Sequence, residues 1–253
     1  MRVALVLLVA ACGDNQSGWT PIFDGKTLDG WYSYLAVSGR DNDPNGIFQV
    51  EDGAIHILGV DLAPGQFEYG YLATTRDYED IRVRFEYQWG PRNFSGFGPD
   101  SGFFVTAVGP DMIWPRSQEC QVYRGDTGSM YLFDYATIET TIDPTIQAPT
   151  YLDGGVPYSA PRNPNPYYAY IAKDAQFDTP DDWNQVEIDV DGDSAVYIVN
   201  GNVTFRSTHR RQPSPDAPDD PTMDIPLTKG RLVIQNEGNE IYYRNIEIQQ
   251  IYE

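Results

Sequence analysis

Short runs in which apolar and polar residues alternate recur along the chain, separated by clusters of Gly, Asp, Asn and Pro. Alternation with a period of two is typical of β-strands that have one face in a core. We find no long helical pattern, so the fold class is all-β, a sandwich or a barrel. The predicted strands cover residues 48–50, 54–57, 70–74, 81–89, 102–107, 119–123, 130–133, 184–190, 194–199, 202–207, 231–235 and 241–251.

Two proline-rich segments interrupt this pattern and are predicted to be loops. Residues 143–168 are rich in Pro, Asn, Gly and Tyr, and residues 212–226 contain five prolines and four aspartates. Neither segment suits a central strand, because proline cannot donate a hydrogen bond to a neighbouring strand. Long loops on a rigid sandwich are often functional. We therefore expect the tyrosines in and just after the first segment to form an ordered rim over a site: Tyr151, Tyr158, Tyr167, Tyr168 and Tyr170.

The first residues form a targeting segment rather than part of the fold. Arg2 precedes a short apolar run, residues 3–9, which is too short to span a bilayer. The small residues before Cys12 and the polar stretch after it resemble a bacterial lipobox, although an ordinary secretory signal that contains a cysteine is the alternative. The predicted organisation is a signal peptide at 1–11, a lipidated Cys12 with a linker to residue 18, and a single domain at 19–253.

This reading places the mature protein in the cell envelope, anchored in a membrane through a lipid on Cys12. Gly13 after the cysteine resembles the sorting signal for the outer membrane rather than the inner one. Cys120 is then the only cysteine left, so no internal disulfide is expected, and it is interpreted as a small buried hydrophobic residue. The net charge of −20 argues against a nucleic-acid partner, which requires basic patches.

The stretch from Trp114 to Gly128 carries the most chemistry. Read as a strand, it directs Glu119, Gln121 and Tyr123 to one face, and Cys120 and Val122 to the other. A carboxylate, an amide and aromatic rings on one face suit sugar binding, or acid–base chemistry on a sugar. The alternative is an ordinary half-exposed strand without a function of its own.

Several short motifs, in order along almost the whole mature chain, resemble one known family. They are Trp19–Trp31, Phe48–Ile55, Leu72–Thr74 with Phe85–Trp89, Asp100–Phe103, Trp114–Gln121 with Gly125–Gly128, Trp183–Asn184, Asn200–Gly201, and Gly230–Gly238 with Tyr243–Ile246. The chain thus resembles the 3-keto-disaccharide hydrolase family. The resemblance implies a concanavalin-like (laminin-G-like) jelly-roll sandwich of two antiparallel sheets, with ligands on the concave face.

The resemblance also implies an activity on glycosides that are already oxidised to a ketone at C3. The ketone acidifies the C2 proton, so a base removes that proton, the C1 substituent leaves by elimination, and water then adds back. Such an enzyme needs a base near C2, an acid near the glycosidic oxygen, and a group that stabilises the enolate. The expected partner is therefore an oxidised glycoside or a glycan.

Two carboxylates are the candidate catalytic residues. Glu119 is the first choice for the base or for a metal ligand, and Glu237 is the second carboxylate, although some family members have His at this position. Arg244, in the Arg–Asn–Ile motif, is expected to form a buried ion pair. The candidate substrate-binding residues are Trp114, Gln121, Tyr123, Asp126, Tyr131 and Gln235.

The sequence leaves the cofactor and the choice between enzyme and binding protein open. Two histidines are too few for a His-rich transition-metal site, so any metal would be a hard divalent cation such as calcium, held by oxygen ligands. Facing carboxylates across the sheet would favour an enzyme. An aromatic platform without them would favour a lectin-like, non-catalytic glycan-binding module, and a structural envelope protein is the third possibility.

The anchor hypothesis predicts that Cys12→Ala releases the protein from membranes, because the thiol that carries the lipid is absent. Cell fractionation followed by immunoblotting measures this directly, with the unaltered chain as the control. Continued membrane association of the variant would contradict the hypothesis.

Overall fold

The computed structural model describes residues 18–59, 61–63, 66–93, 98–165 and 167–251, and their strands form two large sheets in which all strand pairs are antiparallel. The first sheet has 11 strands. They are β1 (Thr20–Pro21), β4 (Phe48–Glu51), β5 (Ala54–Ile57), β9 (Ile81–Asn93), β13 (Thr137–Ile142), β14 (Val156–Ser159), β16 (Asn184–Asp191), β17 (Ser194–Val199), β18 (Asn202–Gln212), β19 (Ile225–Pro226) and β21 (Asn239–Gln250).

The second sheet has eight strands. They are β2 (Trp31–Leu35), β3 (Gly39–Arg40), β8 (Gly70–Thr74), β10 (Asp100–Val108), β11 (Arg116–Tyr123), β12 (Met130–Phe133), β15 (Tyr168–Ile171) and β20 (Arg231–Asn236). A small two-stranded sheet contains β6 (Asp61–Ala63) and β7 (Gln66–Phe67), and one 3₁₀ turn, η1, covers Pro221–Met223.

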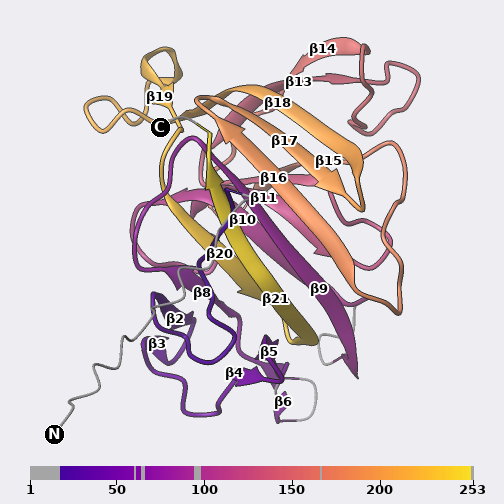
Figure 1. Cartoon of the computed structure of the whole chain (residues 1–253). Helices are drawn as coiled ribbons and strands as arrows, with labels where there is room; N and C mark the ends of the chain where they lie inside the picture. Colours follow the sequence, from indigo (N-terminus) through magenta and orange to yellow (C-terminus); the bar gives the residue numbers. More distant parts are fainter. Residues whose placement is uncertain (1–17, 60, 64–65, 94–97, 166, 252–253) are drawn as a thin grey trace, which may run out of the picture.

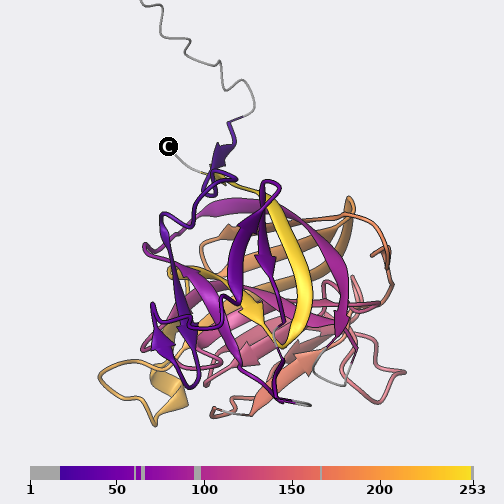
Figure 2. The same ribbon diagram turned by 90° about the horizontal axis from the view of Figure 1, so that it is seen from below.

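The order of the strands places segments that are distant in sequence next to one another. In the 11-stranded sheet, β18, β17, β16, β9 and β21 run side by side across the molecule (Figure 1). In the eight-stranded sheet, β10 lies between β11 and β20, so residues 116–123 and 231–236 flank the same strand. Seen from below, the long strands bend along their length instead of lying flat (Figure 2), as twisted sheets do.

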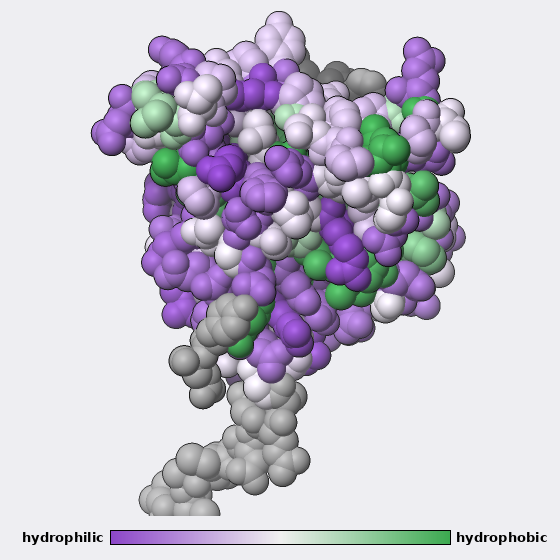
Figure 3. Space-filling view, turned by 90° about the horizontal axis from the view of Figure 1, so that it is seen from above, coloured by the Kyte–Doolittle hydropathy of each residue, from purple (hydrophilic) through white to green (hydrophobic). Residues whose placement is uncertain are grey.

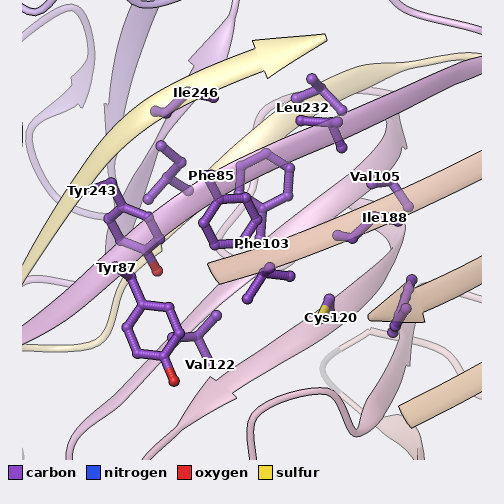
Figure 4. Packing of buried hydrophobic residues seen from close by; sticks show 14 of the residues in the cluster. Phe85, Tyr87, Phe103, Val105, Cys120, Val122, Ile188, Leu232, Tyr243 and Ile246 are labelled. Carbon is purple, nitrogen blue, oxygen red and sulfur yellow. The ribbon is translucent and has the colours of Figure 1, made fainter. Parts of the chain in front are cut away.

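The core lies between the two sheets. The inward faces of β10 and β11 carry Phe103, Cys120 and Val122, all of them fully buried. Phe103 stacks on Phe85 of the opposite sheet with 4.3 Å between the ring centroids, and Tyr243 packs beside this pair (Figure 4). Cross-sheet ring contacts of this kind hold the layers of a sandwich together.

The outward face of the eight-stranded sheet is also largely covered. A second hydrophobic cluster lies on it, and its buried members include Tyr71, Phe104, Phe133 and Val233, with Trp114 and Tyr131 packed against them. The central strands of this sheet are therefore buried on both faces. Polar side chains that lie among these rings are removed from water.

The structure confirms the predicted all-β sandwich of two antiparallel sheets, and each of the twelve predicted strands is present. The prediction that residues 143–168 and 212–226 are entirely loops is wrong, because they contain β14, and β19 with η1. The strands β14 and β19 both lie at an edge of the 11-stranded sheet, where proline is tolerated. The strands β1, β2, β3, β6, β7, β13 and β15 were also not predicted. Arg244 pairs with Glu86, but its side chain is 38% exposed, so the expectation of a buried pair is wrong.

The predicted signal peptide and Cys12 lie outside the described residues. Among the residues that are described, no helix has the length and hydrophobicity that a membrane span requires.

The cross-sheet stack predicts a large effect of Phe103→Ala on stability. Removal of this buried ring leaves a cavity beside Phe85, so we expect the free energy of unfolding to fall by about 3–5 kcal/mol. Denaturant titration measures the loss, with Val37→Ala, which alters a side chain 88% exposed, as the control. A loss below about 1 kcal/mol, the scale of ordinary single substitutions, would contradict the role given to the stack.

Candidate active site

A pocket of about 260 Å³ opens on the outward face of the eight-stranded sheet. The central strands β10, β11 and β20 form its floor, and β12, β15 and the loop before β11 form its sides. Carboxyl, amide and aromatic side chains line it: Asp100, Trp114, Glu119, Gln121, Tyr131, Phe133, Tyr168, Gln235 and Glu237. We call it the acidic pocket.

Strand pairing brings its floor together. On β10 and β11, Gly102 pairs with Gln121 and Phe104 pairs with Glu119. The side chain of Glu119 lies across Gly102, where any Cβ atom would collide with its carboxyl group. Glycine at this position therefore makes room for the carboxyl group in the middle of the sheet.

Glu237 follows directly after β20 and is held by two donors. Gln235 Nε2 donates to its Oε1 at 2.7 Å, and Trp114 Nε1 donates to the same atom at 3.4 Å. Burial raises the pKa of Glu237, and the hydrogen bond from Trp114 opposes that shift because it stabilises the ionised form.

Asp100, at the start of β10, is the second carboxyl group of the pocket. Burial raises its pKa, and the charge of Glu237 raises it further, while hydrogen bonds from Gln121 and from the backbone N–H of Ser101 lower it. The other end of the same amide, Gln121 Oε1, is buried and has no hydrogen-bond partner in the described part of the chain. A buried acceptor without a partner is unfavourable, so it is well placed to receive a hydroxyl group from a ligand.

Glu119 is the most deeply buried of the three carboxyl groups. Its pKa is raised well above the ordinary value, first by burial and then by the charges of Asp100 and Glu237. No ion pair in the described residues involves any of these three groups. Since like charges without a cation cannot all ionise in a buried site, the pocket holds at least one proton near neutral pH.

Aromatic rings form the opposite wall. Trp114 and Phe133 are stacked with 6.1 Å between centroids, and Tyr131 packs on Phe133 at 6.2 Å. Tyr168, half exposed, meets Tyr131 edge-on at 5.0 Å. Flat apolar rings beside polar groups suit the mixed faces of a sugar ring.

The structure brings most of the predicted site residues together. Six of the eight line the acidic pocket: Trp114, Glu119, Gln121, Tyr131, Gln235 and Glu237. Tyr123 and Asp126 lie outside this lining, so a role for them in binding stays a prediction. Asp126 instead accepts hydrogen bonds from Ser129, Tyr170 and Lys173 at 2.6, 2.8 and 3.1 Å, which ties the turn after β11 to the segment after β15.

Three further residues line the pocket, Asp100, Phe133 and Tyr168, of which the first two were not predicted from the sequence. Phe133 was detectable, because it lies two residues after Tyr131 on a predicted strand and therefore shares its face. Asp100 opens a motif used for the family resemblance, but nothing in the motif distinguished its carboxylate from a turn former. Tyr168 was among the tyrosines expected to form a rim, and it alone of those five lines this pocket.

The described residues contain no group of three or more His, Cys, Asp or Glu side chains arranged to hold a metal ion. Cys120 is buried on the inward face of β11, as the alternation predicted, and burial raises the pKa of its thiol.

Fold and site together define a jelly-roll sandwich with a buried acidic pocket of the kind that suits carbohydrate. The chain belongs to the family of 3-keto-alpha-glucoside-1,2-lyase-like domains, whose profile matches residues 18–249. This confirms the resemblance seen in the sequence motifs and connects the chain with glycans. A comparison with curated proteins gave no match.

Solved structures show the same fold. One Parabacteroides distasonis protein, provisionally described as a glycosyl hydrolase, is 20% identical with a TM-score of 0.55, and the similarity covers 94% of this chain and 95% of that one. A second protein from the same organism, described in the same way, is 18% identical with a TM-score of 0.53, covering 92% and 98%. At this level of identity the likeness establishes the fold alone.

The raised carboxyl pKa values predict that stability falls as the pH rises. The unfolded chain releases these protons near pH 4, whereas the folded chain retains them to higher pH, so the folded state binds more protons in between. We therefore expect the melting temperature to fall between about pH 5 and 8. Glu119→Gln, which keeps the shape and removes the ionisation, is expected to flatten this slope.

Scanning calorimetry at several pH values measures the slope. Glu79→Gln is the control, since this exposed side chain pairs with Lys229 and neither residue lines the acidic pocket. A slope that is the same in Glu119→Gln and in the unaltered chain would contradict the raised pKa of Glu119.

Proposed function

We propose that this protein cleaves 3-keto-glycosides in the acidic pocket, by elimination followed by addition of water. One observation carries the proposal: three buried carboxyl groups, Asp100, Glu119 and Glu237, share a pocket with an aromatic wall and have no ion-pair partner in the described residues. Such an arrangement supplies a protonated and an ionised carboxyl group at the same pH. Family membership supports the choice of substrate.

Glu119, which lies across Gly102, and Glu237, which accepts from Gln235, have different surroundings. Glu237 accepts two hydrogen bonds, which favour its ionised form. Glu119 has no hydrogen-bond partner in the described residues and the charges of both neighbours oppose its ionisation. We therefore assign the base to Glu237 and the acid to Glu119, whereas the sequence alone favoured Glu119 as the base.

In the elimination step, the Glu237 carboxylate removes the C2 proton and the C1–O bond breaks. The electron pair passes to the leaving oxygen, which takes the proton of Glu119, and a C1–C2 double bond forms next to the C3 ketone. In the second step, Glu119 takes a proton from water, the hydroxide oxygen binds C1, and Glu237 returns its proton to C2. Both side chains regain their starting states, and the net change is hydrolysis.

The remaining residues of the pocket bind and orient the sugar. Burial, and then the charge of Glu119, raises the pKa of Tyr131, so its hydroxyl stays neutral and is available to donate a hydrogen bond to the enolate oxygen. Gln121 Oε1 accepts a hydrogen bond from a sugar hydroxyl. Trp114 and Phe133 cover one face of the ring.

A non-catalytic, lectin-like site is the second candidate function. The continuous aromatic wall of Trp114, Phe133, Tyr131 and Tyr168 favours it, because stacked rings bind sugars without any chemistry. In either case we propose that the protein works at the cell envelope, held by the lipid on Cys12.

The test is a panel of aryl 3-keto-glucosides and their unoxidised parents, incubated with the protein beginning after Cys12, with and without calcium, manganese or chelator. We expect the aryl alcohol to be released from the keto forms alone. Glu237→Gln and Glu119→Gln are expected to lower kcat/KM by about 10²–10⁴-fold, the usual contribution of acid–base groups. Glu187→Gln, on the outer face of the other sheet, is the matched control and should retain the rate.

Unchanged rates in both pocket variants would remove these residues from the mechanism. Absence of release from every keto compound, together with saturable binding of a glycan that Trp114→Ala weakens, would overturn the enzyme in favour of the lectin-like site. The chelator arm shows whether a metal takes part.

A further inference from the structure

A second cavity, of about 290 Å³, lies on the other sheet. It is bordered by the β13–β14 hairpin, by β18, and by the loop that joins β13 to β14. None of its lining residues lines the acidic pocket. We call it the hairpin cavity, and its lining includes Thr140, Thr141, Tyr151, Tyr158, Arg206 and Ser207.

Hydrogen bonds hold the elements around this cavity in place. Thr140 Oγ1 donates to the carbonyl of Arg206 at 2.6 Å, which joins β13 to β18. Thr141 Oγ1 donates to the carbonyl of Leu152 at 2.6 Å, which fixes the loop to the hairpin. The backbone N–H of Tyr151 donates to Ala172 at 2.7 Å. The cavity is therefore pre-formed, as small-ligand sites usually are.

Two buried hydroxyl groups belong to residues of its lining, Tyr151 Oη and Ser207 Oγ, on residues that are 3% and 2% exposed. Among the described residues, Tyr151 Oη meets only the side chain of Arg206. Burial raises the pKa of this tyrosine, and the hydrogen bond from Arg206 opposes the rise. Ser207 Oγ has no hydrogen-bond partner in the described residues. Buried polar groups are normally paired, and an orphaned one is unfavourable. These incompletely paired hydroxyls in the lining of one cavity point to a ligand that supplies the missing hydrogen bonds.

The lining indicates what this ligand is. Tyr151 and Tyr158 provide aromatic surface. The hydroxyls of Thr140 and Thr141 donate to backbone carbonyls and remain available as acceptors, and the hydroxyl of Ser159 can donate and accept. The charged members of the lining have both signs, since Arg206 lies with Glu139 and Asp153. A lining of mixed polarity without one dominant charge does not select an ion. It fits a neutral ligand that presents both hydroxyl groups and apolar C–H faces.

The surrounding surface does not resemble a protein interface. Seen from above, where β13, β14 and β19 lie in Figure 1, the surface is mostly hydrophilic, with small, separate hydrophobic groups (Figure 3). Protein partners usually dock on a contiguous patch with an apolar centre. The volume and polarity of the cavity instead suit one unit of a larger polyhydroxylated molecule.

We propose that the hairpin cavity is a second saccharide-binding site, which holds one sugar unit of a neutral glycan apart from the acidic pocket. A sugar unit held in this cavity keeps the protein bound to a glycan chain, so that an end or a branch of the same chain can enter the acidic pocket. The inference does not depend on the catalytic steps proposed above, because it concerns different residues on a different sheet.

The test is isothermal titration calorimetry with three neutral probes: maltotriose, cellotriose and laminaritriose. At least one is expected to bind. Tyr158→Ala, which removes an aromatic face, is expected to weaken that binding at least tenfold. Tyr151→Phe, which removes only the hydroxyl beside Arg206, is expected to weaken it severalfold with no loss of melting temperature, so the test remains valid if Tyr158→Ala folds poorly.

A control variant tests whether the effects belong to this site. Tyr167→Ala removes an exposed tyrosine that lines neither cavity, and it is expected to bind the trisaccharide like the unaltered chain. The proposal is overturned if none of the three probes binds, or if binding is unchanged in Tyr158→Ala and Tyr151→Phe. It is also overturned if Glu119→Gln abolishes binding while Tyr158→Ala retains it, because the sugar then occupies the acidic pocket. Failure of the keto-glycoside assay leaves this result unaffected.

Discussion

The alternation of side chains along β11, inside a sheet that is covered on both faces, is the constraint on which the rest of the molecule depends. Cys120 and Val122 enter the core, so Glu119 and Gln121 must lie on the outer face. A shift of one residue in the pairing with β10 would put a carboxyl group into the core and expel the apolar side chains. The packing of the core therefore holds the site in register, and the chemistry follows from the hydrophobic pattern.

The acidic pocket is a place where the fold gives up stability. Burial raises the pKa values of Asp100, Glu119 and Glu237, and neighbouring carboxylate charges raise those of Asp100 and Glu119 further. The described residues provide no cation to pair with these three groups. Elsewhere the same fold pairs its buried acids: Glu240 accepts from Arg92 and His56, which lowers its pKa to about 2. Unpaired buried acids destabilise a fold, so their presence in the acidic pocket indicates a functional site.

The two sheets place polar chemistry in different settings. On the eight-stranded sheet, the outer face is roofed by aromatic rings, so its carboxyl groups are desolvated and their protonation is altered. The hairpin cavity on the 11-stranded sheet has an exposed rim, where Arg206 and Asp153 remain in contact with water. The first setting suits proton transfer, and the second suits reversible binding through hydroxyl groups and rings.

The sequence by itself determined the fold class, most of the strands and the polar face of β11, because alternation with a period of two is a local property of the chain. It also indicated Glu119 and Glu237 as candidates. Only the tertiary structure decided that these two groups share a pocket with Asp100, that Gly102 makes room for Glu119, and that Asp126 is tied to Lys173 instead. These facts depend on which strands pair across long separations in sequence and on how much water their packing excludes, and no local pattern contains either quantity.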